Sequence, residues 1–192
     1  MRNALILAFG FFGIRRSAEL FANKSRRMGL LRSHVTVTEG QSVNLYIQSQ
    51  KNDTTAKGNL IHLSWVTQSG VCLGDMVTDY VGSLAQDGIP ADSPFFLPTA
   101  RVGTFVSVEP GSVSKLNYVI KQLISEFYPG VTEQVLKEYS FHSLRRGGAT
   151  WARSRGVPLG LIIALGLWTT VDGARSYLVP SEEEKTLASF LM

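Results

Sequence analysis

The chain of 192 residues is 44% hydrophobic and 18% charged and carries a net charge of +4. These values are ordinary for a folded globular protein, and the length is sufficient for one domain with a buried core. The single cysteine, Cys72, excludes an intramolecular disulfide framework and a zinc site built from cysteines, which indicates a reducing compartment.

Positive charge is concentrated in two distant segments. Residues 1–38 hold seven Lys or Arg and one acid, and residues 142–180 hold five Arg and one acid. The segment between them is acidic, with six basic and ten acidic residues. If folding brings the two basic segments together, they form a positive patch typical of a site for a polyanion. Two separate solvated helix faces would explain the same charges.

Residues 3–24 are predicted to form one helix, because apolar residues recur at helical spacing, although Gly10 and Gly13 weaken it. The apolar run at residues 4–14 is short for a membrane span and has no small-residue cleavage site. A core helix is therefore expected here, with no membrane contact. A chain that opens inside a core helix also indicates that a domain is missing upstream.

The central part of the chain changes to strand patterns. Residues 34–50 alternate apolar and polar side chains around Glu39-Gly40-Gln41, which predicts a hairpin. Residues 59–66 predict a third strand after a polar loop at residues 51–58. Further helices are predicted at residues 71–86, 112–130, 142–155, 157–167 and 182–192. The expected fold class is α+β, mainly α: a helical domain with a small three-stranded antiparallel sheet.

Side chains that could take part in catalysis or binding occur together in one predicted helix. His142 and Arg145 are three positions apart and therefore lie on one helical face. A guanidinium offers a planar fork of donors that suits phosphate, and an imidazole can move a proton near neutral pH. Gly147 and Gly148 allow another group to approach the backbone closely. Taken alone, a capping histidine and a surface arginine are the plainer explanation of the pair.

The wider segment resembles the catalytic domain of the tyrosine recombinases, the family of the phage integrases and Cre recombinase. The residues HSLRR, then LGLW, then a tyrosine nine positions after the tryptophan, match that family's His-x-x-Arg, its His or Trp, and its tyrosine nucleophile. The resemblance places these on His142, Arg145, Trp168 and Tyr177. It implies that residues 1–192 form such a catalytic domain without the family's upstream DNA-clamping domain.

The family also has an earlier arginine in an Arg-x-x-Glu motif and a lysine in a β-hairpin loop. The resemblance assigns these to Arg16, three residues before Glu19, and to Lys51. Arg15 is the alternative when the position is counted from the preceding Gly13, because this chain has one residue more than the family between the glycine and the glutamate. Lys57, in the same loop, is the alternative to Lys51.

The resemblance implies a site-specific DNA recombinase or integrase that cleaves and rejoins DNA through a 3′-phosphotyrosyl intermediate. Arg16 and Arg145 would bind the non-bridging oxygens of the scissile phosphate, with Trp168 as a further donor. Tyr177 would attack, with His142 helping to remove its proton, while Lys51 would protonate the departing 5′ oxygen. The chemistry needs no metal or other cofactor.

The resemblance also implies partners and a location. Double-stranded DNA is the expected partner, bound by a homotetramer on paired sites, with residues 181–192 docking into a neighbouring protomer. The expected location is the cytoplasm or nucleoid of a prokaryote, or the nucleus of a eukaryote. Two other functions remain open: a type IB topoisomerase, which relaxes DNA, and a non-catalytic DNA-binding relic of a mobile element.

Overall fold

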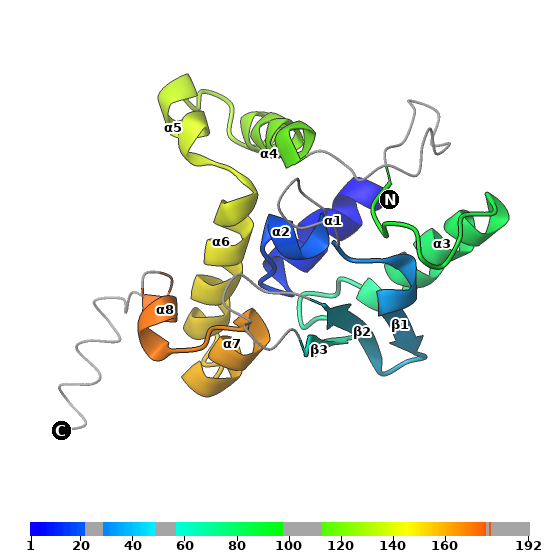
Figure 1. The fold of residues 1–192 in the computed structure, drawn as a ribbon. Coiled ribbons are helices and arrows are strands. Elements are labelled where there is room, and N and C mark those ends of the chain that lie inside the picture. The colour runs from blue at the N-terminus through cyan, green and yellow to red at the C-terminus, as the bar shows by residue number, and fades with distance from the viewer. Residues whose placement is uncertain (22–28, 49–56, 98–112, 176, 178–192) are drawn as a thin grey trace.

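The computed structural model describes residues 1–21, 29–48, 57–97, 113–175 and 177 (Figure 1). The helices are α1 (Arg2–Phe11), α2 (Ser17–Leu20), α3 (Leu73–Gln86), α4 (Val113–Phe127), α5 (Glu133–Glu138), α6 (Phe141–Ser154), α7 (Leu159–Gly166) and α8 (Val171–Arg175). The strands are β1 (Val35–Thr38), β2 (Ser42–Ile47) and β3 (Asn59–Ser64), and they form one antiparallel sheet in the order β1-β2-β3. The predicted fold class, mainly helical with one small antiparallel sheet, is confirmed.

The sheet has one buried face, as the alternating sequence predicts. Val35 pairs with Leu45, and Val43 pairs with Leu63, and all four side chains are buried. Gly40 turns the chain between β1 and β2 with a φ of 68°, a left-handed conformation that glycine adopts without strain. The buried face packs against α3, so the hairpin and third strand belong to the main core.

The predicted single helix at residues 3–24 is wrong. α1 ends at Phe11, and the chain turns before the short α2 begins at Ser17. A side chain at Gly13 would meet the Phe9 carbonyl at 2.6 Å, and Ile14 has a left-handed φ of 55°. Apolar periodicity continues through this break, which is why the pattern alone does not reveal it. The consequence is that Arg15 and Arg16 lie on a turn rather than on a helix face.

α1 packs closely against α6, and glycines make this possible. A Cβ at Gly148 would collide with the Phe11 carbonyl, and one at Gly10 would lie 2.8 Å from the Phe141 ring. The close backbone approach expected at Gly147 and Gly148 is therefore found at Gly148, where the approaching element is α1, whereas a Cβ at Gly147 would meet only the Phe11 ring at 3.4 Å. This contact brings the start of the chain against α6, so parts of the two basic segments, residues 1–38 and 142–180, meet.

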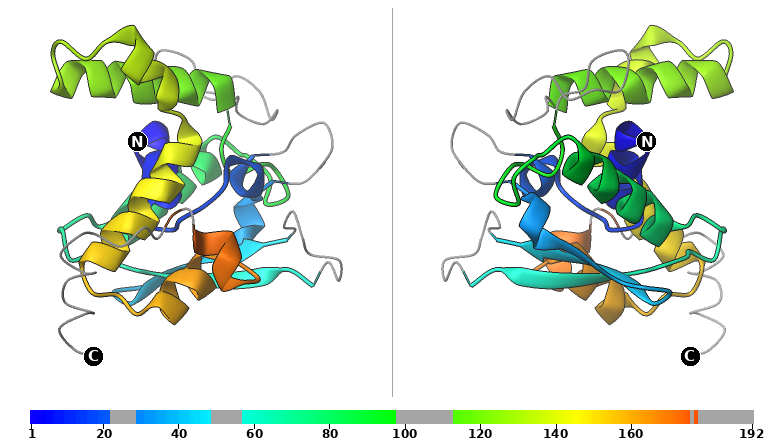
Figure 2. Two further views of the ribbon diagram at one scale, coloured as in Figure 1. Left: turned by 90° about the vertical axis from the view of Figure 1, so that its left-hand side faces the viewer. Right: turned by 90° about the vertical axis from the view of Figure 1, so that its right-hand side faces the viewer.

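The side chains form a large and a small core. The large core lies among α1, the sheet, α3 and α6, and the stacked pair Phe9 and Phe95 lies within it. The small core contains Ile14, Ala149, Ile162, Trp168 and Ala174, with the Tyr177 ring packed against it. Both views of Figure 2 show α4 and α5 at the opposite end of α6 from α7 and α8. The small core is therefore the part of the fold that shapes the predicted site.

Other predicted elements are mostly found. α3, α4, α6 and α7 match the predicted helices to within two or three residues at each end, whereas the predicted tail helix at residues 182–192 lies outside the described residues. The sequence analysis missed α5, although Thr132 accepts a hydrogen bond from the Val135 amide at 3.4 Å and so caps it. A threonine followed by Glu133 is an ordinary helix start and could have revealed it. Among the described residues, no helix combines the length and apolarity that crossing a bilayer requires.

Candidate active site

Three predicted site residues meet around the ring of Tyr177. The Tyr177 hydroxyl lies 2.9 Å from Nε2 of His142, within hydrogen-bonding distance. The rings of Tyr177 and Trp168 lie 5.3 Å apart, and the Arg145 guanidinium carbon is 6.0 Å from the Tyr177 ring centre. The i, i+3 spacing on α6 does bring His142 and Arg145 to a common partner. The arrangement joins a phenol, an imidazole and a guanidinium.

Arg145 is held inside the protein. Its side chain is fully buried and donates hydrogen bonds to the carbonyls of Ile14 and Gly166, the second at 2.7 Å. Its guanidinium carbon lies 4.0 Å from the centre of the Trp168 ring, a cation–π contact. Its Nε is buried and has no hydrogen-bond partner among the described residues. Arg145 therefore joins the α1–α2 turn to the end of α7 and still retains one unused donor.

Burial determines the charge state of this arginine. Loss of solvation, together with the positive charge of Arg16, lowers the pKa of Arg145 to about 9, and Glu19 partly offsets the effect. Because this value is above 7, the guanidinium remains positive at neutral pH. An anion beside Arg145 would raise its pKa back toward the usual value. The attraction between the two charges would be strong, because the guanidinium is already removed from water. The site is thus electrostatically prepared for a negatively charged group.

The end of α7 places Trp168. Leu167 ends the helix in a left-handed conformation with a φ of 53°, and the Trp168 amide donates to the Ile163 carbonyl at 3.1 Å. A Cβ at Gly166 would run into the Trp168 ring, so a glycine is needed there. The tryptophan is 8% exposed and covers Arg145 with its face. The phosphate-donor role expected of Trp168 stays a prediction, and in the structure the ring face packs over the guanidinium of Arg145.

His142 is positioned to accept a proton. Burial lowers the pKa of His142 below its usual 6.5, and the positive charges of Arg145, Arg16 and Arg146 lower it further. The imidazole is therefore neutral at pH 7. When its Nε2 carries no proton, that nitrogen accepts the hydrogen bond of the Tyr177 hydroxyl. The pair has the geometry of a nucleophile beside a general base.

Arg16 and Arg15 have different surroundings although they are adjacent. Arg16 is 30% exposed at its side chain and donates to Glu19 at 2.9 Å, and its charge lowers the pKa of both His142 and Arg145. Arg15 is fully buried, pairs with the other oxygen of Glu19 at 3.3 Å and donates to the Gly13 and Leu165 carbonyls. All the described donors of Arg15 are directed into the protein. Of the two, Arg16 has the partly exposed side chain, in agreement with the count from Glu19, and the choice between Arg15 and Arg16 stays a prediction.

We expect substitutions of Arg15 and Arg16 to have different effects, the first on stability and the second on catalysis. Arg15→Ala should lower the midpoint of thermal unfolding more than Arg16→Ala does, because it removes one partner of a buried ion pair. The expected loss of unfolding free energy is on the order of 3 kcal/mol. Arg16→Ala should leave unfolding nearly unchanged, since its side chain is partly solvated, but should reduce the DNA cleavage expected from the family resemblance, measured per folded molecule, more than Arg15→Ala does. Calorimetry and a single-turnover cleavage assay measure the two effects. The reverse pairing of effects would assign the ligand contact to Arg15.

The structure treats the two candidate lysines differently. Lys51 lies outside the described residues. Lys57 is exposed just before β3, and its main-chain carbonyl accepts a hydrogen bond from the Tyr46 hydroxyl at 3.1 Å. That contact fixes the base of the β2–β3 loop and leaves the Lys57 side chain directed to solvent. The choice between Lys51 and Lys57 stays a prediction.

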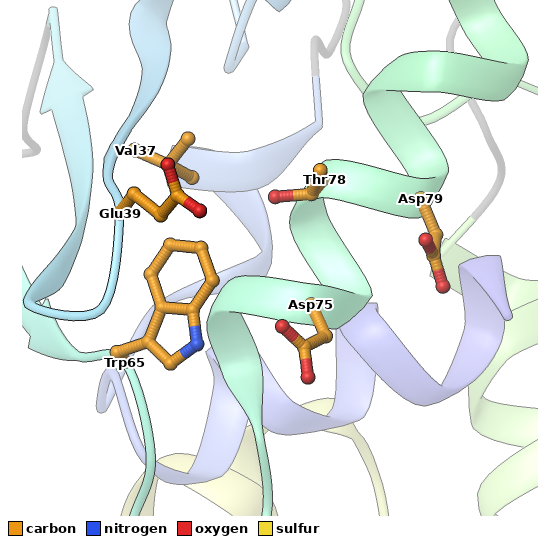
Figure 3. A pocket seen from close by; sticks show the side chains of 6 residues that line it. All are labelled: Val37, Glu39, Trp65, Asp75, Thr78 and Asp79. Carbon is orange, nitrogen blue, oxygen red and sulfur yellow. The ribbon is translucent and has the colours of Figure 1, made fainter.

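The hollows on the described surface include one along α6 and one beside the hairpin. One, of about 360 Å³, follows α6 and is lined by Glu138, Tyr139, Ser143, Arg146, Gly147 and Thr150. The other, of about 350 Å³, lies between the hairpin and α3; Glu39 and Asp75 lie beside the Trp65 ring, and Asp79 lies further along α3 (Figure 3). The second hollow has no basic lining residue and would repel a polyanion. Within the described ranges, no cluster of His, Cys, Asp or Glu is suited to hold a metal ion.

Comparison with solved structures shows which known proteins share this fold. The chain is 16% identical to the XerH site-specific recombinase bound to its difH substrate, with a TM-score of 0.62, over 98% of this chain and 46% of that one. It is 15% identical to XerA recombinase, with a TM-score of 0.55, over 99% of this chain and 61% of that one. For the Tn1549 transposon integrase in complex with circular intermediate DNA, the identity is 11% and the TM-score 0.52, over 99% and 59%. No protein-family model and no curated protein matches the chain.

These likenesses establish the fold. The chain has the mainly helical fold of the tyrosine recombinases, with the three-stranded antiparallel sheet predicted from the sequence. It spans between 46% and 61% of the length of these solved recombinase and integrase chains. The family resemblance stated from the sequence is therefore confirmed at the level of fold.

Proposed function

We propose that this chain is the catalytic domain of a site-specific DNA recombinase or integrase that cleaves and rejoins strands through a 3′-phosphotyrosyl intermediate. The observation that carries the proposal is the hydrogen bond of 2.9 Å between Tyr177 and His142, beside the buried charge of Arg145. The fold supports it, because the similar XerH structure is bound to its difH DNA substrate and XerA is a recombinase. DNA is accordingly the proposed substrate.

The reaction assigns a role to each side chain. The Tyr177 oxygen attacks the phosphorus of a phosphodiester and forms a P–O bond as its proton passes to Nε2 of His142. Arg145 and Arg16 stabilise the charge that develops on the non-bridging oxygens. The bond to the 5′ oxygen breaks, and Lys51, with Lys57 as the alternative, donates the proton that this oxygen takes up. Attack on the phosphotyrosine by a 5′ hydroxyl rejoins a strand.

The proposed assembly is a homotetramer on paired DNA sites. The two basic segments of the chain supply the electrostatic basis for binding DNA, since α1 and α6 bring them together. The segment at residues 181–192, proposed to link neighbouring protomers, lies outside the described residues. Analytical ultracentrifugation of the full chain with paired sites, with and without residues 183–192, measures that linkage.

A covalent trap tests the proposal. Duplexes of randomised sequence, each nicked so that the cleaved fragment diffuses away, should yield a protein–DNA adduct whose tryptic peptide carries a nucleotide on Tyr177. Binding without an adduct would favour the non-catalytic relic. Once the trapped sequence is known, joining of two sites supports the recombinase, whereas relaxation of supercoiled DNA without joining would indicate a topoisomerase.

The pH dependence of adduct formation should reveal His142 as the base. Because burial and the neighbouring arginines lower its pKa, the imidazole stays neutral down to a pH below 6.5. We expect the rate to be constant near pH 7 and to fall only below pH 6.5, where His142 becomes protonated. His142→Gln should slow the reaction and remove this acidic limb. His62→Gln, on the exposed face of β3, is the matched control and should keep it. An acidic limb centred above pH 7 would contradict the assignment.

A further inference from the structure

Tyr177 is attached to α6 at two points. Its hydroxyl meets Nε2 of His142 at 2.9 Å, and its main-chain carbonyl accepts a hydrogen bond from the Thr150 hydroxyl, also at 2.9 Å. His142 and Thr150 are eight residues apart on the same helix, a rise of about 12 Å along its axis. One rigid helix thus holds both the side chain and the backbone of the tyrosine.

The hydrogen bond from Thr150 to the Tyr177 carbonyl can persist during the reaction, whereas the bond between the Tyr177 hydroxyl and His142 cannot. α8 ends at Arg175, and the Tyr177 amide donates to the Ala174 carbonyl at 2.9 Å, so among the described residues local bonding fixes the chain on the N-terminal side of the tyrosine. Thr150 fixes the carbonyl on the other side. During the reaction the phenol must leave His142 for phosphorus, and the bond to Thr150 is the attachment to α6 that can persist through that step.

We propose that Thr150 is a positioning residue for the nucleophile: its hydroxyl holds the Tyr177 carbonyl, so that the phenol is bonded to His142 before the reaction and stays within reach of the phosphate as it moves to phosphorus. This inference rests on the proposed function of Tyr177. It adds a residue that the sequence pattern does not mark, because Thr150 lies 27 positions before Tyr177. Thr150 touches no reacting atom and acts through the tyrosine.

The test compares three α6 variants of the full chain. Thr150→Val keeps the shape and removes the hydroxyl, and Thr150→Ser restores the hydroxyl without the methyl group. Ser154→Ala is the matched control, because the Ser154 hydroxyl lies one turn further along and, among the described residues, donates to the Trp151 carbonyl of its own helix, at 2.8 Å. Single-turnover adduct formation at saturating trapped DNA gives the rate, and a DNA titration gives the affinity.

We expect Thr150→Val to slow adduct formation on the order of fivefold, the factor that one ordinary hydrogen bond supplies, with unchanged DNA affinity. Thr150→Ser should recover the wild-type rate to within about twofold, and Ser154→Ala should match the wild type. An unchanged rate in Thr150→Val, or equal slowing in Thr150→Ser, would overturn the inference. No adduct from the wild-type protein would instead overturn the proposed function.

A second measurement does not depend on activity. Trypsin cuts after Arg175, whose side chain is 84% exposed, and a looser Tyr177 segment should be cut faster. Thr150→Val should accelerate this cleavage without accelerating cleavage after Arg146 or Arg153 on α6. Equal acceleration at all three arginines would show a general loss of stability and would also overturn the inference.

Discussion

Tyr177→Phe is expected to abolish the covalent protein–DNA adduct while DNA affinity stays nearly unchanged. The substitution removes one oxygen, the proposed nucleophile, and leaves the ring to pack against Trp168 and the small core. Binding depends chiefly on the basic surface, which the change does not alter. A trapped-substrate gel measures the adduct, and a salt titration of binding measures the affinity.

A matched variant separates the nucleophile from a general aromatic effect. Tyr139→Phe removes a hydroxyl from a tyrosine beside the start of α6, in the hollow along that helix. It should form adduct at the wild-type rate. An adduct formed by Tyr177→Phe would show that another side chain attacks and would end the assignment of Tyr177.

Arg145→Ala is expected to slow cleavage by raising the activation free energy by roughly 3 kcal/mol or more, which is the cost of losing one preorganised hydrogen-bond donor. The same change leaves the Ile14 and Gly166 carbonyls without their partner and the Trp168 ring without its cation, so the unfolding free energy should also fall. Rates must therefore be measured per folded molecule, with circular dichroism to count the folded fraction.

Arg145→Lys distinguishes the two roles of this side chain. A lysine keeps the positive charge but cannot present a planar fork, so it should restore part of the stability and little of the rate. Arg153→Lys, further along α6, is the control for the same exchange outside the site. Recovery of the full rate in Arg145→Lys would show that charge alone suffices and that the fork geometry has no role.

The sequence revealed the order of the site residues better than their environments. The spacing from His142 to Tyr177 placed four side chains, of which the structure brings His142, Trp168 and Arg145 around the Tyr177 ring. The hairpin was predictable because period-two alternation and a glycine turn are local signals. The fold class followed from these elements together.

Features that depend on distant contacts were not predictable. The break after Phe11 depends on the left-handed Ile14, and no local pattern marks an isoleucine for that conformation. The complete burial of Arg15 and Arg145 depends on carbonyls of Ile14, Leu165 and Gly166, contributed by segments far apart in the chain. From sequence alone, a charged residue is predicted to be exposed unless its buried partners are known.

The two buried arginines also bear on how the protein is made. Arg15 lies 150 residues before the Leu165 carbonyl to which it donates. At ribosomal speeds of about 5–20 residues per second, this guanidinium waits roughly 8–30 s for its partner to be synthesised. A nascent chain that stops before α7 therefore lacks the carbonyl that accepts this hydrogen bond from Arg15. Such a chain also lacks Trp168 and Tyr177, so the contacts among the phenol, the imidazole and the guanidinium can form only after the C-terminal part of the chain has been synthesised.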